Sequence, residues 1–158
     1  KKRLAGNQVI IAYMRKSSNF AGYTVKPQIK AKMAGKIIKA NGEVKVAKNG
    51  KGISLVFECV RRDEGWATKF IDRMKLYKDF YDNFVQFDCG FQMPPQLIFV
   101  CEDDKHTIEV FKELVKNGVV IDKIKYYFTT EFLLFVLVPQ ALNYYYYTLY
   151  DAKTNYHQ

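Results

Sequence analysis

A glutamate inside a predicted strand is the residue of this sequence best suited to chemistry. Glu58 lies in "ISLVFECV" (53–60), and the preceding strand opens near Asn41 and Glu43. A metal-dependent phosphodiesterase site needs two or three carboxylates around a hard cation, with a basic group beside the attacked phosphate. The hairpin has the skeleton of such a site, because it offers one acidic position per strand and a cation position two residues after Glu58, occupied here by Val60.

Two positions of this skeleton lack the required chemistry, because Asn41 is neutral and Val60 is apolar. In an active enzyme, Glu43 would supply the first carboxylate, and Lys69 or Arg73, from the following helix, would supply the cation. The catalytic residues would then be Glu58, Glu43 and Lys69. The ligands of a Mg²⁺ or Mn²⁺ ion would be Glu58, Glu43 and Asn41.

The interpretation that we favour gives Glu58 no metal. A carboxylate that is buried or half-buried must be paired, and Arg61, Arg73 or another cation could pair with it. A further alternative is that Glu58 faces water. We therefore expect a domain that needs no cofactor, with Mg²⁺ or Mn²⁺ required only if the enzyme alternative holds.

The charge of the chain is unevenly distributed. Its 158 residues carry a net charge of +9. Residues 1–79 hold 19 Lys and Arg against 6 Asp and Glu, whereas residues 80–158 hold 6 against 10, so the two halves carry +13 and −4. This asymmetry favours a basic face that meets a polyanion, although a solvated lysine-rich surface is the alternative. The candidate phosphate contacts are Arg61, Arg62, Lys69, Arg73, Lys36, Lys39 and Lys45.

The elements that must position these residues begin with a helix at about 4–16, followed by short irregular strands over 23–48. The Asn-Gly pair at 49–50 predicts a hairpin turn between "EVKVAK" and "ISLVFECV". Period-two alternation places Glu58 on one face of its strand with Ser54, Val56 and Val60. The other face carries Ile53, Leu55, Phe57 and Cys59.

The strongest helix prediction covers residues 65–84, where large apolar side chains recur every three or four positions. This stripe favours core packing over base stacking, and its members are Trp66, Phe70, Met74, Tyr77, Tyr81 and Phe84.

The second half alternates strands and helices. "QLIFVCED" (96–103) is apolar on successive residues, as in a strand covered on both faces. A helix should follow over 103–118, ended by Gly118, then a strand over 120–130 and a short helix or strand at 130–136. The tyrosine-rich tail, 143–151, predicts an edge strand or hairpin. The fold class is therefore α/β, with a mixed central sheet flanked by helices in a single domain, 1–158.

Other site chemistries are not favoured. The three cysteines, Cys59, Cys89 and Cys101, have no close spacing and are interpreted as reduced core thiols of a cytoplasmic protein. His106 is expected at the surface and His157 is terminal, so a histidine-based nucleophile or zinc site is not predicted. No apolar run approaches the ~20 residues that span a bilayer, and we expect no membrane partner.

Several segments, taken in order, resemble the nuclease-like domain of the replication-relaxation family of plasmids and mobile elements in Gram-positive bacteria. "LAGNQVIIAYMR" is similar to the family's helix with a Leu-x-x-Asn pattern, and "KANGEVKV" to its Pro-Asp strand. "LVFECVRRDEGW" resembles its Glu-x-Asp strand end, and "FIDRMKLYKDFY" its helix with a Lys and then a Tyr. "PQLIFVCED" and "YYFTTEFLL" follow as its later strands do. This sequence departs from the family at Ala40, Asn41, Val60 and Arg73.

The resemblance implies a restriction-endonuclease-like core, of the PD-(D/E)XK type, that usually follows an N-terminal winged-helix DNA-binding domain. On that basis this chain would be a fragment that lacks the winged helix. We expect a non-catalytic DNA-binding accessory domain in plasmid replication or conjugative transfer. The alternatives are a Mg²⁺- or Mn²⁺-dependent endonuclease and a protein-interaction domain that forms homo-oligomers or binds other replication or transfer proteins.

Overall fold

The computed structural model describes residues 2–16, 19–31, 36–84, 87–88, 91, 93–119, 126–131 and 147–148. Three helices lie in these ranges: α1 (Lys2–Lys16), α2 (Trp66–Asp82) and α3 (Asp104–Lys116). The strands are β1 (Phe20–Val25), β2 (Gln28–Ala31), β3 (Ile37–Lys39), β4 (Gly42–Lys48), β5 (Lys51–Cys59), β6 (Phe87–Asp88), β7 (Gln96–Cys101), β8 (Tyr126–Thr130) and β9 (Tyr147–Thr148).

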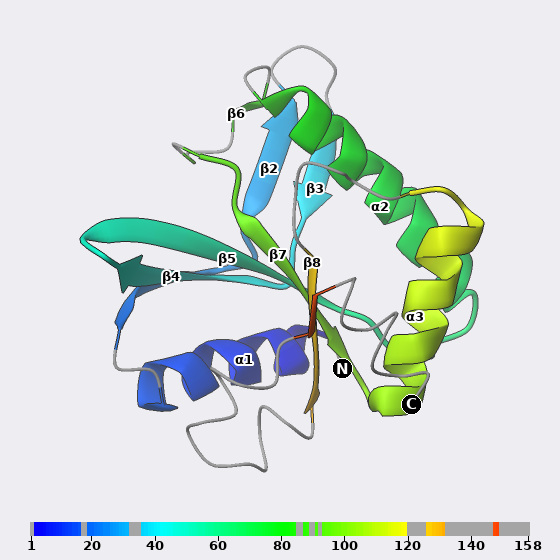
Figure 1. Ribbon diagram of the computed structural model, residues 1–158, viewed down its shortest axis with the longest axis horizontal. Helices are drawn as coiled ribbons and strands as arrows, with labels where there is room; N and C mark the ends of the chain where they lie inside the picture. The colour runs from blue at the N-terminus through cyan, green and yellow to red at the C-terminus, as the bar shows by residue number, and fades with distance from the viewer. Residues whose placement is uncertain are drawn as a thin grey trace.

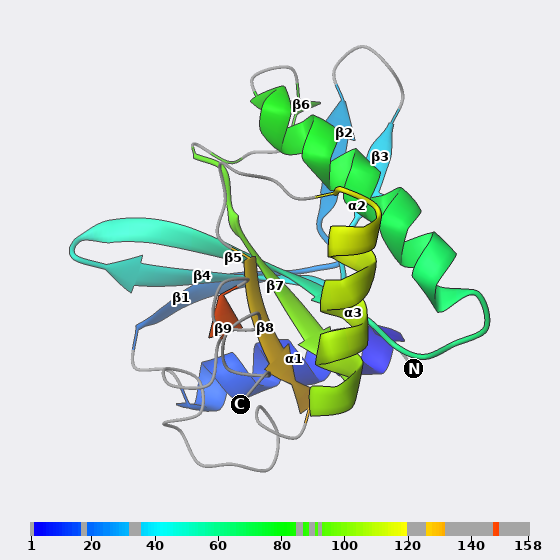
Figure 2. The ribbon, with the colours of Figure 1, turned by 45° about the vertical axis from the view of Figure 1, so that its right-hand side comes forward.

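The main sheet is mixed, with strand order β1-β4-β5-β7-β8-β9. Strands β1, β4 and β5 are antiparallel, whereas β5, β7 and β8 are parallel and are connected through α2 and α3. A smaller antiparallel sheet, β3-β2-β6, lies beside α2 (Figures 1 and 2). The predicted α/β class with a mixed sheet and flanking helices is therefore confirmed.

Helix α1 covers one face of the main sheet, and α2 and α3 cover the other (Figures 1 and 2). The α1 side is filled by Val9, Ile10 and Tyr13 against the β5 residues Leu55 and Phe57. Helix α1 approaches the start of β4 closely, because a Cβ atom added at Gly6 would lie 2.3 Å from the carbonyl oxygen of Asn41. The position of this helix against the sheet therefore requires a glycine at residue 6.

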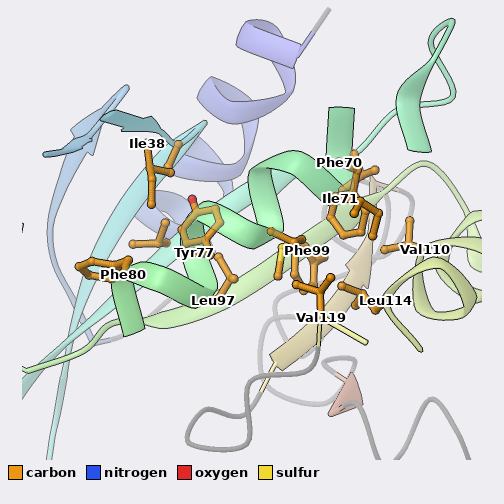
Figure 3. Close-up of a cluster of buried hydrophobic side chains, with 14 of the residues drawn as sticks. Ile38, Phe70, Ile71, Tyr77, Phe80, Leu97, Phe99, Val110, Leu114 and Val119 are labelled. Atoms are coloured by element: carbon orange, nitrogen blue, oxygen red, sulfur yellow. The ribbon is translucent and has the colours of Figure 1, made fainter. Parts of the chain in front are cut away.

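The larger core lies between α2, α3 and the sheet (Figure 3). The aromatic stripe of α2 faces it, as predicted: Phe70, Met74, Tyr77 and Tyr81 are buried, with Trp66 and Phe84 packed at its edges. Strand β7 is covered on both faces, also as predicted, because Leu97 and Phe99 belong to this core and Ile98 and Val100 to the α1 core. The hydrophobic pattern alone was sufficient for both predictions.

The predicted hairpin is confirmed. Strands β4 and β5 pair in antiparallel register from Gly42↔Phe57 to Lys48↔Lys51. The turn residues Asn49 and Gly50 have φ of 51° and 73°, the left-handed values that an Asn-Gly turn supplies. The alternation along β5 also holds, since Val56 and Val60 enter the α2 core while Leu55, Phe57 and Cys59 enter the α1 core.

The prediction that His106 lies at the surface is wrong. His106 is 0% exposed in the first turn of α3, with its ring edge-on to Trp66 at a centroid distance of 4.9 Å. Burial lowers the pKa of its imidazole. The helix is capped by Asp103, whose carboxylate accepts a 2.7 Å hydrogen bond from the His106 amide.

The structure describes only some of the residues to which the remaining predictions apply. Helix α3 ends before Gly118, which has φ of 62°. Cys59 and Cys101 are free and buried, and burial raises the pKa of the Cys101 thiol to about 12. Tyr147–Thr148 pairs with β8 at the edge of the main sheet, in agreement with the edge strand predicted for the tail, whose other residues, 143–146 and 149–151, lie outside the described residues. Cys89, His157 and the predicted elements over 120–125 and 132–136 lie outside the described residues. No helix in the described ranges is long and apolar enough to cross a membrane.

Candidate functional site

Asn41 is hydrogen-bonded to the end of β5 through both its backbone and its side chain. Its backbone amide donates to the carbonyl of Phe57 (3.0 Å), and its side-chain Oδ1 accepts a 2.8 Å hydrogen bond from the amide of Cys59. The residue thus extends the hairpin by one further rung, directly beside Glu58. Because Oδ1 already accepts from the backbone, the predicted metal ligand is engaged in strand pairing.

Glu58 is 4% exposed, and both of its carboxylate oxygens have partners. The hydroxyl of Tyr77 donates to Oε1 at 2.5 Å, and Nε of Arg73 lies 3.3 Å from Oε2. Burial, and then the nearby carboxylate charge of Glu58, raise the pKa of Tyr77 well above its usual value, so the phenol stays protonated and donates. The predicted pairing of Glu58 is therefore confirmed, and its cation is Arg73.

Arg73 also connects this pair to the small sheet. Its Nη2 donates to the carbonyl oxygen of Lys39 at 2.5 Å, at the end of β3. The guanidinium therefore joins α2, β5 and β3 around one carboxylate. Its side chain remains 33% exposed, so it neutralises Glu58 while still facing solvent.

A pocket of about 240 Å³ opens over Glu58 and brings several predicted site residues together. Its polar lining consists of Asn41, Glu58, Arg61, Lys69 and Arg73. Its apolar lining consists of Cys59, Val60, Trp66 and Phe70. Val60 is 5% exposed and its amide continues the pairing with β7, so the cation position of the nuclease skeleton is a core residue.

Two further hollows adjoin this pocket and share residues with it. One, of about 290 Å³, shares Lys69 and Arg73 with it and adds Lys39. The other, of about 380 Å³, shares Asn41 with the pocket and Lys39 with the second hollow, and adds Lys26. We call these three hollows the basic groove. Its charged lining is Lys26, Lys39, Arg61, Lys69 and Arg73 against Glu58 and Asp72.

Arg61 and Arg62 are neutralised by acidic side chains of the second half of the chain. Arg61 contacts Glu131 at 2.5 Å and Glu102 at 3.6 Å. Arg62 makes a bidentate contact with Asp103, with two distances of 2.9 Å, and also contacts Glu109. The Arg62 guanidinium, together with the capping hydrogen bond, lowers the pKa of Asp103 to about 2.

The other predicted residues lie in separate surroundings. Lys36 lies 3.5 Å from Asp79, and Lys45 lies 3.8 Å from Glu43. Burial raises the pKa of Glu43, against the opposing effect of Lys45. Glu43 shares the sheet face of Glu58 but does not line the pocket above it. Within the part of the chain that the structure describes, no group of three His, Cys, Asp or Glu side chains could hold a metal ion.

Sequence reasoning missed two contributors to the groove. Lys26 has φ of 53° at the corner between β1 and β2, directly before Pro27. Asn7, in the Leu-x-x-Asn pattern of α1, lines the hollow that contains Lys26 and Asn41. The pattern signalled Asn7 within a motif, whereas no local signal identified Lys26.

No protein-family model matches this chain, and a search of curated proteins finds no significant match.

Proposed function

We propose that this chain is a DNA-binding domain without catalytic activity, which serves a plasmid or mobile-element protein of replication or conjugative transfer. The observation that carries the DNA-binding part is the basic groove. Lys26, Lys39 and Lys69 have no carboxylate partner among the described residues, so their charge is available to a polyanion. The duplex and single-strand backbones both present phosphates that such a groove would neutralise.

The absence of catalysis is inferred from how the candidate metal ligands are used. Glu58 is engaged by Tyr77 and Arg73, and Asn41 is engaged by the backbone of β5. A divalent cation would have to displace Arg73 from Glu58 and would gain no second carboxylate in the pocket. The arrangement therefore favours a carboxylate that positions Arg73 at the groove.

The place in replication or transfer rests on the resemblance of sequence segments to the replication-relaxation family. The hairpin, the mixed sheet and the helical crossovers are compatible with a restriction-endonuclease-like core. In this proposal the core has kept its fold and its basic groove, while the positions of Asn41 and Val60 have lost the acid and the cation.

The test is a binding measurement on charge variants at one salt concentration. In Lys39→Gln with Lys69→Gln, two groove cations are removed, and we expect affinity for a fluorescein-labelled DNA to fall about tenfold or more. The matched control is Lys112→Gln with Lys116→Gln, which removes the same charge from exposed positions of α3. Equal losses in both pairs would reject the groove as the interface.

The endonuclease alternative has its own measurement. Lys69 and Glu58 line one pocket, so a weak activity would depend on both. Supercoiled plasmid is incubated with the protein and Mn²⁺, alongside the Glu58→Gln variant. We expect no nicking by either protein. Nicking by the parent that disappears in Glu58→Gln would overturn the non-catalytic assignment.

A further inference from the structure

We infer that the pocket over Glu58 takes a single unpaired nucleotide, with its base stacked on Trp66, so that the groove prefers single-stranded DNA to duplex DNA. This inference rests on the proposed function and names the form of nucleic acid that the same site recognises. Its starting observation is that the Trp66 side chain lines a pocket together with charged and polar side chains as well as apolar ones.

One face of α2 presents the stacking and phosphate-binding groups together. Trp66, Lys69 and Arg73 follow one another at spacings of three and four residues, which align on one side of a helix. All three line the pocket over Glu58. A nucleotide needs this combination, an aromatic surface for its base and cations for its phosphate.

The Trp66 ring is fixed for this role by its neighbours. It packs edge-on against the buried His106 at 4.9 Å and against Phe70 at 6.4 Å, while the residue as a whole remains half-buried. A ring held from one side and facing a pocket on another loses little freedom when a base stacks on it. Such a stack is sequence-tolerant, because every base has a π-face.

The size of the pocket limits its occupant to no more than one nucleotide. At about 240 Å³ it lies just below the ~300 Å³ at which typical small-molecule sites begin. In a duplex, both faces of each base are covered by neighbouring base pairs. A base therefore reaches Trp66 only from an unpaired strand or after flipping out, which costs energy in a duplex.

The experiment uses the fact that Trp66 is the single tryptophan of the chain. Its intrinsic fluorescence is followed during titration with a single strand of about ten nucleotides and, separately, with the same strand annealed to its complement. Binding of each DNA is measured in parallel by anisotropy of a fluorescein label. We expect the single strand to quench Trp66, to bind at least about fivefold more tightly, and the duplex to bind without quenching.

The variants separate stacking from folding. Trp66→Ala should weaken single-strand binding at least about fivefold, while Trp66→Phe, which keeps an aromatic ring, should retain most of it. Tyr23→Ala removes an aromatic side chain that is 51% exposed on β1 and should leave binding unchanged. Thermal unfolding of each variant shows whether Trp66→Ala is folded, and the wild-type titration stands if it is not.

The outcomes distinguish this inference from the proposed function. Binding of the single strand without quenching, or equal quenching and equal affinity for duplex, would overturn the nucleotide pocket and leave a DNA-binding groove in place. Binding of neither DNA at low salt would overturn both. Quenching confined to the single strand, with Trp66→Phe retaining affinity, would support both.

Discussion

Replacing Tyr77 by phenylalanine tests whether the buried Glu58 carboxylate is ionised and paired with Arg73. The Tyr77 side chain is 0% exposed, and its hydroxyl donates to a carboxylate that is itself 4% exposed. A hydrogen bond to a charged group contributes about 1.5–3 kcal/mol. Phenylalanine keeps the ring packing, and Arg73 still pairs with Glu58, so we expect Tyr77→Phe to lower the free energy of unfolding by about 2 kcal/mol.

The same substitution in a Glu58→Gln background isolates the charge. There the tyrosine donates to a neutral amide, whose hydrogen bond contributes about 1 kcal/mol. The double-mutant cycle should therefore give a coupling free energy of about 1 kcal/mol between positions 58 and 77. Urea unfolding measures each free energy, with equal m-values as the sign that the unfolded states are comparable.

Tyr81→Phe is the matched control. Tyr81 lies one turn further along α2, is also buried, and donates to the neutral backbone carbonyl of Pro95 at 2.9 Å. Loss of this hydrogen bond should lower the free energy of unfolding by about 1 kcal/mol, and Tyr81→Phe should show no coupling to Glu58→Gln. If Tyr77→Phe costs no more than Tyr81→Phe, or costs the same in both backgrounds, the charged centre that we describe is refuted.

Three further predictions concern the groove and its supports. Gly6→Ala should lower the free energy of unfolding by about 1–3 kcal/mol in urea unfolding, because its methyl group would meet the carbonyl of Asn41. Asp103→Ala should cost about 1 kcal/mol at neutral pH, because it removes a helix cap. The Arg62 guanidinium lowers the pKa of Asp103 to about 2, so the stability that the Asp103 carboxylate contributes is complete above pH ~4 and declines as the pH falls toward 2. Acid titration of the wild type and of Asp103→Ala would show this difference. The pKa of Tyr77 is raised in the folded state, so the stability that its hydroxyl contributes is complete below pH ~10 and is lost as the pH rises above that value. In alkaline unfolding, the free energy of unfolding of Tyr77→Phe should therefore decline less than that of the wild type.

The parts of the fold that depend on local pattern could be predicted from the sequence. Asn49-Gly50 predicted the hairpin because few residue pairs adopt two positive φ values. The stripe from Phe70 to Tyr81 predicted the buried face of α2, because helical spacing and core packing agree there. The pairing of Glu58 was also predictable in kind, since a buried carboxylate requires a partner.

The contacts that assign partners were not predictable from local pattern. Arg61 pairs with Glu131, 70 residues away, and the guanidinium of Arg62 pairs with Asp103 and Glu109, 41 and 47 residues away. These long-range pairs remove charge from two residues that the sequence favoured as phosphate contacts. His106 was misjudged for a similar reason, because its acidic neighbours in sequence suggested a solvent-exposed turn, whereas Trp66 of α2 covers its ring.

In the function that we propose, Lys26, Lys39, Lys69 and Arg73 of the basic groove bind the phosphates of DNA. The most direct measurement is the logarithm of the association constant for a single-stranded oligonucleotide against the logarithm of salt concentration, for the wild type and for Lys39→Gln with Lys69→Gln. Three to four neutralised phosphates predict a wild-type slope of about −2 to −3, and the double variant should have a slope shallower by about 1.4. A wild-type affinity that does not change with salt, or a variant with an unchanged slope, would contradict the account.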